Sequence, residues 1–377
     1  MFFHVILTSN CNLQCKYCFG ESLDDFDKEF GPEDIQVDYD LPRSLNYDIS
    51  LLERFSRQDP ECVLTFYGGE PLLQPDTLRG IMDQISPKHY MIQTNGLLLN
   101  RLEPKYVNLF HTILVSLDGE EVLTDHYRGA GTYRKVIENL KLIKQNGFKG
   151  ELIARMTIME QTDIEKQVRY LLNNPDFSFT SIHWQLNAGF WGNDYQRRNF
   201  EEWTKRSYIP GVEALMKFWV DQMEQKGIVL KLYPILGIAH SLLNNEKDCL
   251  MRCGAGWINY AIQTDGYIIP CPTMWGIKAY YLGHIKNANP LQLKKFFVNQ
   301  KPCVECPILG VCGGRCLYTN ITKRWTDEAY KKVCHTVDEL IKSVQSQIPL
   351  IQQLIKKGKI KLEYFDYIKY NGSEIIP

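Results

Sequence analysis

The sequence predicts an α/β protein: a partial (β/α)6 barrel of the TIM type, followed by a cysteine-rich domain and a terminal helix. Two observations carry this prediction. Over residues 1 to about 190, short runs rich in β-branched and aromatic residues alternate with segments of helical periodicity. From 249 to 334 this alternation fades, and cysteine, glycine and proline become frequent. Because alternating strands and helices imply parallel strands with right-handed crossovers, the first half should form an open barrel.

The predicted elements follow one another regularly along the chain. Strands are expected at 2–9, 62–67, 89–93, 112–117, 151–158 and 181–186. Helical periodicity separates them at 50–57, 76–85, 104–109, 133–146 and 163–172. In such folds the ligand lies at the carboxyl ends of the strands. Residues directly after each strand are therefore the candidate site residues.

Four segments describe the expected organisation. Residues 1–194 form the barrel, 195–248 a helical bridge, 249–335 the cysteine-rich domain, and 336–377 a tail with an amphipathic helix at 336–357. Within the barrel, residues 21–45 are acidic and lack periodicity. They are interpreted as a surface insertion, either a lid or a solvated acidic loop.

Composition narrows the class of protein. The 377 residues are 44% apolar and 23% charged, with 43 lysines and arginines against 44 acidic residues. This balance argues against a protein built to hold nucleic acid or an anionic membrane. The start, MFFHVILTSN, lacks the basic region of a signal peptide, and no apolar run reaches membrane-spanning length. A cytosolic location is expected, with neither nucleic acid nor membrane as a partner.

Cys11, Cys15 and Cys18 form a C-x3-C-x2-C triplet after the first predicted strand. Clustered cysteines in a reducing compartment more often hold metal than form disulfides. A four-iron cluster held by three cysteines leaves one iron open to bind a substrate. The alternatives are a zinc site, which needs a fourth ligand, and chance spacing.

With Tyr17 before its last cysteine, the triplet resembles the signature of radical S-adenosylmethionine (SAM) enzymes, and the resemblance continues at later strand ends. Gly68, Gly69 and Glu70 match a GGEP segment that holds the SAM amino group in that superfamily. Segments similar to TNG and SLDG, which line the SAM pocket, supply Thr94, Asn95, Ser116 and Asp118. Arg128 and Arg155 resemble arginines near the SAM carboxylate, a role that suits a bidentate guanidinium; the alternative is an ordinary ion pair.

Eight further cysteines follow the barrel. Their spacing resembles the SPASM extension of radical SAM peptide maturases, which carries two auxiliary [4Fe–4S] clusters. The resemblance assigns one cluster to Cys249, Cys253, Cys271 and Cys316, and the other to Cys303, Cys306, Cys312 and Cys334. If Cys249 is not a ligand, the first of these clusters also has an open iron. The remaining Cys62 is expected to be a small buried hydrophobe, and a single zinc ion at 303–316 is the rival interpretation.

The resemblance implies three [4Fe–4S] clusters, SAM, and reductive cleavage of SAM to a 5′-deoxyadenosyl radical that abstracts hydrogen from a peptide or protein substrate. The start of the chain looks most like an archaeal peptide-modifying branch. A low-potential donor of the ferredoxin or flavodoxin type would supply electrons. Sulfatase-maturing members carry an acidic base after the cysteine equivalent to Cys271, where this chain has Pro272. The alternatives are a multi-cluster electron carrier and a radical SAM dehydrogenase of small molecules; the catalytic acid or base is not identified.

Overall fold

The computed structural model describes residues 1–18, 36–188, 194–246, 250–298, 300–322 and 326–369. Among these residues, nine strands form one sheet in the order β7-β6-β5-β4-β3-β2-β1-β8-β9. Every neighbouring pair is parallel except β8 and β9. The strands are β1 (Phe2–Thr8), β2 (Val63–Gly68), β3 (His89–Thr94), β4 (Phe110–Ser116), β5 (Glu151–Ile158), β6 (Ser181–Leu186), β7 (Lys231–Leu232), β8 (Asn259–Ile262) and β9 (Ile268–Ile269). The predicted partial barrel is confirmed.

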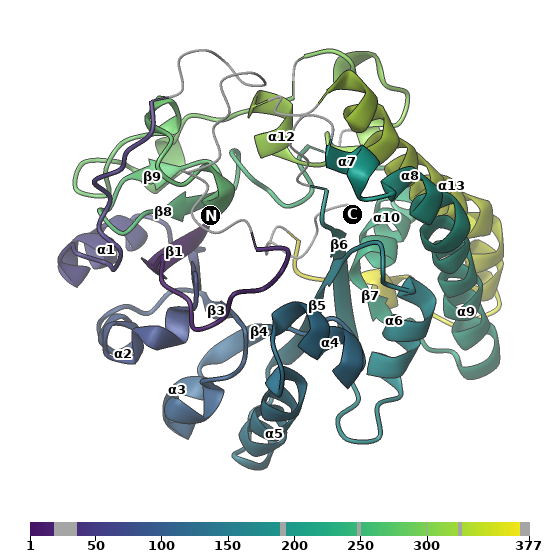
Figure 1. Cartoon of the computed structure of the whole chain (residues 1–377), viewed down its shortest axis with the longest axis horizontal. Coiled ribbons are helices and arrows are strands. Elements are labelled where there is room, and N and C mark those ends of the chain that lie inside the picture. Colours follow the sequence, from purple (N-terminus) through teal and green to yellow (C-terminus); the bar gives the residue numbers. More distant parts are fainter. Residues whose placement is uncertain (19–35, 189–193, 247–249, 299, 323–325, 370–377) are drawn as a thin grey trace.

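Helices line the outer side of the curved sheet, as Figure 1 shows. The crossover helices are α1 (Ile49–Ser56), α2 (Pro75–Gln84), α3 (Pro104–Val107), α4 (Glu121–Arg128), α5 (Thr132–Gln145) and α6 (Ile164–Leu172). Alternate strand residues such as Phe3, Val5 and Leu7 meet these helices in the main core. Helix α4 was not predicted from the sequence, because its eight residues lie between Gly119 and Gly129 and present only a short periodic pattern.

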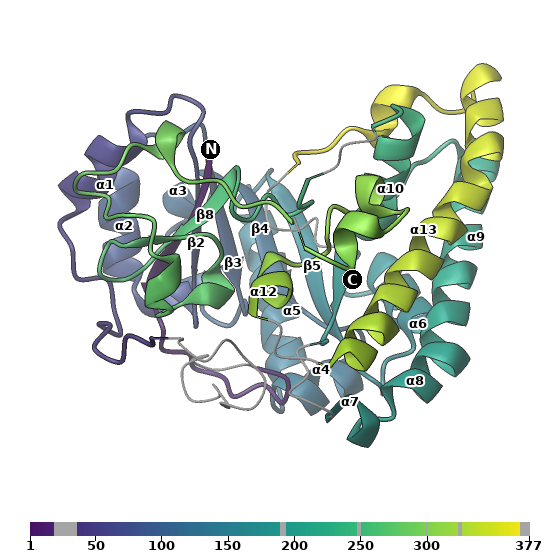
Figure 2. The same ribbon diagram turned by 90° about the horizontal axis from the view of Figure 1, so that it is seen from above.

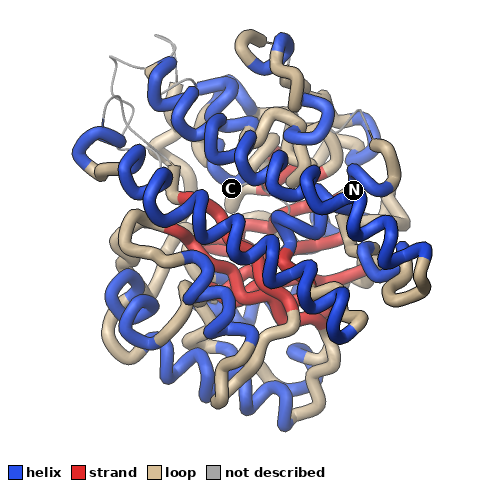
Figure 3. The backbone as a smooth tube through the Cα atoms, turned by 90° about the vertical axis from the view of Figure 1, so that its right-hand side faces the viewer, coloured by secondary structure: helices blue, strands red, loops and turns tan. Residues whose placement is uncertain are grey.

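A second group of helices follows β6 and covers one side of the barrel. It comprises α7 (Asp194–Arg197), α8 (Phe200–Trp203), α9 (Ile209–Lys226), α10 (Tyr233–Leu243), α11 (Leu309–Cys312), α12 (Leu317–Thr322) and α13 (Asp327–Lys356). Helix α13 packs along α9 and α10 (Figures 1 and 2). Figure 3 shows these long helices in front of the strands. No helix among the described residues is long and apolar enough to cross a membrane.

The start of α13 differs from the prediction. The helix begins at Asp327 rather than near residue 336, because the Thr326 side chain accepts a hydrogen bond from the Ala329 amide at 3.2 Å. Such a side-chain cap satisfies an amide that otherwise lacks a partner. The first turns of α13 consequently carry residues of the cysteine-rich region.

The cysteine-rich region has more structure than its composition indicates. Strand β8 pairs in parallel with β1, and β9 returns beside β8. A second core joins Met251, Ala261, Trp275 and Leu317 to Ile6 of the first strand. The cysteine-rich region therefore shares its core with the barrel. Its strands are too short, at four and two residues, to stand out in the sequence.

The segment after the cysteine triplet was expected to be a lid or a solvated loop. Residues 19–35 lie outside the described residues, but the segment from 36 onwards contacts the cysteine-rich region. Val37 forms an antiparallel bridge with Ile277, and the Asp38 amide donates to the Gly276 carbonyl at 2.7 Å. The end of the segment is therefore joined to the cysteine-rich region.

Candidate functional site

The cysteine triplet lies in the loop that leaves the carboxyl end of β1, directly against the end of β2. The Gly69 amide donates to the Thr8 carbonyl at 2.8 Å, and the Glu70 amide donates to the Asn10 carbonyl at 2.9 Å. A Cβ atom at Gly68 would lie 2.1 Å from the Thr8 oxygen, and one at Gly69 would lie 2.3 Å from the Asn10 oxygen. Gly68 also has a φ of +140°. These glycines therefore allow the end of β2 to pack against β1 and the cysteine loop.

Glu70 joins the ends of β2 and β3. Its fully buried carboxylate accepts hydrogen bonds from the Thr94 hydroxyl at 2.8 Å, the Asn95 amide at 2.7 Å and the Leu72 amide at 3.0 Å. Burial raises the pKa of Glu70 to about 7, although these hydrogen bonds act in the opposite direction. The structure thus gives Glu70 a role in holding two strand ends in register. Its predicted contact with the SAM amino group remains a prediction.

Asn95 extends this connection to the cysteine loop. Its side-chain amide nitrogen donates to the Asn12 side-chain oxygen at 2.7 Å and lies 3.9 Å from the Cys11 sulfur. The Asn95 side-chain oxygen accepts from the Leu97 amide at 3.0 Å. Residues from three successive strand ends are therefore in contact around the first cysteine.

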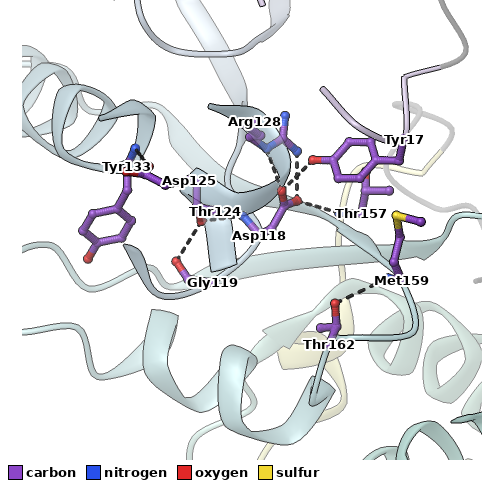
Figure 4. A network of polar contacts seen from close by, with 10 residues as sticks. All are labelled: Tyr17, Asp118, Gly119, Thr124, Asp125, Arg128, Tyr133, Thr157, Met159 and Thr162. Atoms are coloured by element: carbon purple, nitrogen blue, oxygen red, sulfur yellow. Dashed lines mark hydrogen bonds and ion pairs between the residues drawn. The ribbon is translucent and has the colours of Figure 1, made fainter. Parts of the chain in front are cut away.

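Asp118, after β4, is the centre of a second polar network, drawn in Figure 4. Arg128 donates to both of its oxygens, at 2.8 and 2.9 Å, and the Tyr17 hydroxyl donates to one of them at 2.5 Å. The Thr157 amide of β5 completes the set at 2.9 Å. Asp118 is fully buried and Arg128 is only 6% exposed. The pair is therefore a buried ion pair that connects the cysteine loop to β4, α4 and β5.

This network changes what can be said of Arg128. The arginine also lies over the Tyr17 ring, 5.3 Å from its centroid, and the Lys16 amide donates to the Tyr127 carbonyl at 2.9 Å. Helix α4 thus holds the middle of the cysteine triplet by two separate contacts. Arg128 forms a bidentate ion pair with Asp118. Its predicted contact with the SAM carboxylate remains a prediction. The ion pair that Arg128 forms is buried, unlike the ordinary surface pair that was the alternative.

Ser116 and Arg155 occupy neighbouring positions on β4 and β5, where they are register partners. Arg155 is 9% exposed and donates to the Gln185 side-chain oxygen at 2.9 Å. Burial lowers the pKa of Arg155, while the charges of Tyr67 and Cys253 partly offset this effect. Arg155 therefore lies between the end of β2 and the cysteine-rich region. The positive charge of Arg128 in the Asp118 pair lowers the pKa of Arg155 further.

The three thiols of the first triplet are close enough to influence one another. Burial raises the pKa of Cys15, and the charges of Cys18 and Cys11 add to the effect. Cys11 and Cys18 are exposed and Cys15 is half-buried. Three accessible thiols at one strand end are the donor set that a [4Fe–4S] cluster with one open iron requires. The triplet fits this cofactor.

The downstream cysteines divide into two groups. Cys303, Cys306, Cys312 and Cys334 line one cavity, whose other walls include Ile308, Leu309, Val333 and Val337. Cys271 is associated with Cys316: burial raises the pKa of Cys271 to about 11, and the charge of Cys316 contributes next. Cys253 packs against the same second core as Cys271, and Asn259 of β8 donates to the Cys253 carbonyl at 3.0 Å. Cys249 lies outside the described residues.

The shared cavity groups Cys303, Cys306, Cys312 and Cys334 as the sequence predicts. That these four thiols bind a closed [4Fe–4S] cluster remains a prediction. Within the described ranges, no group of three or more His, Cys, Asp or Glu side chains is arranged to hold a metal ion. In a four-iron cluster each thiolate binds a different iron, so its ligands are spaced more widely than those of one ion. Cys62, directly before β2, is only 1% exposed, as expected for a buried cysteine.

The sequence did not reveal several polar residues around these groups. Thr157 contributes only its backbone amide to Asp118, so no sequence pattern could have identified it. His4 of β1 donates from Nδ1 to the Asn259 side-chain oxygen at 3.0 Å, across the β1–β8 pair. Tyr330 and Asn320 contact Cys303 from outside the predicted ligand set. No sequence pattern singled out Tyr330, because the helix that carries it was expected to begin only near residue 336.

Comparison with known proteins gives the family. Residues 5–170 match the model of the radical SAM superfamily. The chain is 22% identical over 335 residues to the radical SAM cyclopropyl synthase TigE of Paramaledivibacter caminithermalis, over 83% of this chain and 67% of TigE. It is 24% identical over 296 residues to the cysteine-type anaerobic sulfatase-maturating enzyme of Clostridium novyi, over 74% of this chain and 75% of that enzyme.

The fold has a close counterpart among solved structures. The structure of native anSMEcpe with bound AdoMet and Cp18Cys peptide superposes with a TM-score of 0.68 at 18% identity, covering 94% of this chain and 99% of that one. An open parallel barrel with a three-cysteine loop at its carboxyl edge is the architecture of a radical SAM enzyme. Residues 5–170 are a radical SAM domain, and the proteins that the chain resembles include sulfatase-maturating and other peptide-modifying enzymes. The family implies a [4Fe–4S] cluster and SAM as cofactors.

Proposed function

We propose that this protein is a radical SAM peptide or protein maturase that abstracts hydrogen from a side chain or backbone position of its substrate. The observation that carries the proposal is the cysteine loop held by Glu70, Asn95 and Asp118 at the carboxyl edge of the sheet. A cluster bound there would supply the electron that cleaves SAM to a 5′-deoxyadenosyl radical. The neighbours that bind peptides, such as anSMEcpe with its Cp18Cys peptide, support a peptide substrate.

The roles of the chain's own residues follow from their places. Cys11, Cys15 and Cys18 would hold the SAM-binding cluster. Glu70 and Asp118 keep the loop that would hold the cluster fixed against two strand ends. Arg155 supplies a buried positive charge on β5 towards the cysteine-rich region. Holding SAM and substrate at a fixed site would let the radical react with the substrate before it is quenched.

The downstream cysteines complete the proposal. Cys303, Cys306, Cys312 and Cys334 would hold one auxiliary [4Fe–4S] cluster, and Cys253, Cys271, Cys316 and Cys249 the other. Their role would be to take up the electron left after hydrogen abstraction or to bind substrate. A low-potential protein of the ferredoxin or flavodoxin type would be the electron donor, and the cytoplasm the location. The position of Pro272 after Cys271 favours a product other than the formylglycine of sulfatase maturation.

Anaerobic reconstitution tests the radical chemistry. The protein should bind about twelve irons if three four-iron clusters are present, and should form 5′-deoxyadenosine from SAM with dithionite as the reductant. Cys15→Ala should abolish this product, whereas Cys62→Ala, at the buried cysteine outside all three groups, should retain it. Fully loaded protein that yields no 5′-deoxyadenosine would contradict the proposal and favour a multi-cluster electron carrier.

A second experiment identifies the substrate class. The protein should be co-expressed with a short peptide encoded beside its gene, and the peptide analysed by mass spectrometry. A crosslink formed by loss of hydrogen should lower the peptide mass, and co-expression with Cys15→Ala should leave the peptide unmodified. Cleavage of SAM without any modification of the peptide would instead favour a radical SAM dehydrogenase of small molecules.

A further inference from the structure

Tyr330, in the first turn of α13, lies at the cavity formed by the last group of cysteines. Its hydroxyl oxygen is 3.0 Å from the Cys303 sulfur and 2.5 Å from the Asn320 side-chain oxygen. Helix α13 places Tyr330, Val333, Cys334 and Val337 along the same cavity wall, as the spacing of three and four residues on one helix face requires. Apart from the cysteines, Tyr330 shares the cavity wall with the polar residues Arg315 and Thr319 and with several aliphatic side chains.

Asn320 of α12 fixes the position of this hydroxyl. Its side-chain nitrogen donates to the Gly314 carbonyl at 2.5 Å and to the Cys316 carbonyl at 2.9 Å. With the nitrogen engaged on these two carbonyls, the Asn320 oxygen must point towards Tyr330. Cys316 belongs to the other downstream group, so Asn320 and Tyr330 connect the backbone of one cysteine group to the sulfur of the other.

The direction of the Tyr330 hydrogen bond depends on the state of Cys303. The hydroxyl carries one hydrogen, and two acceptors lie within reach of it. A thiol can itself donate, but a thiolate bound to iron can only accept. A hydrogen bond to a charged acceptor is roughly twice as strong as one to a neutral acceptor. Once Cys303 is a thiolate, its sulfur is therefore the preferred acceptor over the neutral amide oxygen of Asn320.

We propose that Tyr330 donates a hydrogen bond to the Cys303 thiolate and thereby raises the reduction potential of the auxiliary cluster held by Cys303, Cys306, Cys312 and Cys334. The inference rests on the proposed function, because it requires that cluster. Reduction adds one electron and hence one negative charge to the cluster, and a donor aimed at a ligand sulfur stabilises that charge. Hydrogen bonds to cluster sulfurs are among the factors that set iron–sulfur potentials. Tyr330 keeps its proton throughout.

The test compares midpoint potentials in the full-length reconstituted protein. Tyr330→Phe removes only the hydroxyl, and dithionite titration followed by electron paramagnetic resonance measures each cluster separately. The variant should disfavour reduction of one cluster by threefold to tenfold, which corresponds to a negative shift of about 30–60 mV for one electron. The matched control is Tyr267→Phe, at a 39% exposed tyrosine that stacks on Tyr281 in the same region. The control should leave all potentials unchanged.

Two further results separate the possible failures. If wild-type protein binds only the iron of the SAM cluster, the proposed function fails in its auxiliary-cluster part before Tyr330 is tested. If wild type and Tyr330→Phe carry equal iron but have equal potentials, the role of Tyr330 is refuted. If the phenylalanine variant loses iron, 3-fluorotyrosine at position 330 decides the matter. This analogue keeps the ring and donates more strongly, so it should shift the same potential in the positive direction, and no shift would overturn the proposal.

Discussion

The buried ion pair between Asp118 and Arg128 should be the most sensitive point of the SAM site. Asp118→Asn replaces an oxygen that accepts hydrogen bonds with an amide group that donates. In the native arrangement one carboxylate oxygen accepts from Tyr17 and Arg128, and the other accepts from Arg128 and the Thr157 amide. The variant would place a donor against two donors and leave the guanidinium, 6% exposed, without a compensating charge.

The expected cost follows from that geometry. Removing one partner of a buried ion pair typically destabilises a protein by about 3–5 kcal/mol, because the remaining charge stays buried. The assay is urea unfolding of the cluster-free protein, with Asp76→Asn as the matched control. Asp76 also pairs with an arginine, at 2.6 Å, but it is 95% exposed, and such pairs often contribute nothing measurable.

A double-mutant cycle distinguishes loss of the pair from general damage. Arg128→Gln should be about as harmful as Asp118→Asn, since it leaves the carboxylate unpaired. The double variant should cost clearly less than the sum, because neither charge then remains. Strictly additive effects, or a midpoint for Asp118→Asn equal to that of Asp76→Asn, would refute the reasoning.

The remaining predictions concern the glycine contact, a buried histidine and the last cysteine group. Gly69→Ala would place a Cβ 2.3 Å from the Asn10 oxygen, so the triplet should lose its iron, about four per chain; Gly80→Ala, inside α2, should be neutral or stabilising by about 0.5–1 kcal/mol. Burial lowers the pKa of His4 from 6.5 to about 4. Between these pH values the unfolded chain binds a proton at His4 that the folded chain does not, so the protein should lose about 3 kcal/mol of stability as pH falls from 6.5 to 4. Urea unfolding at each pH should show no such loss for His4→Gln. The same pH dependence in wild type and variant would contradict this role of His4. Cys334→Ala should remove about four irons and abolish peptide modification but leave SAM cleavage intact; unchanged iron content would contradict the assigned ligand set.

The strands, and the loops that carry the cysteines and polar site residues, could be predicted from the sequence because both depend on local patterns. The predicted strands at 89–93 and 151–158 match β3 and β5 to within a residue. Parallel order then brings their carboxyl ends to one edge, so the contacts among Glu70, Thr94 and Asn95 follow from motifs that come directly after strands. Helix α4 was missed although it carries Arg128, since eight residues between two glycines give little periodicity.

What the sequence alone determined is the set of donors and the order of the barrel strands: three cysteines after the first strand, and polar residues after the next three. Only the tertiary structure decided how distant segments meet. It pairs β8 with β1, commits Arg128 to Asp118, and brings Tyr330 to Cys303. The physical reason is that motif spacing records neighbours along one chain segment, whereas ion pairing, strand pairing and burial depend on contacts between residues far apart in the sequence.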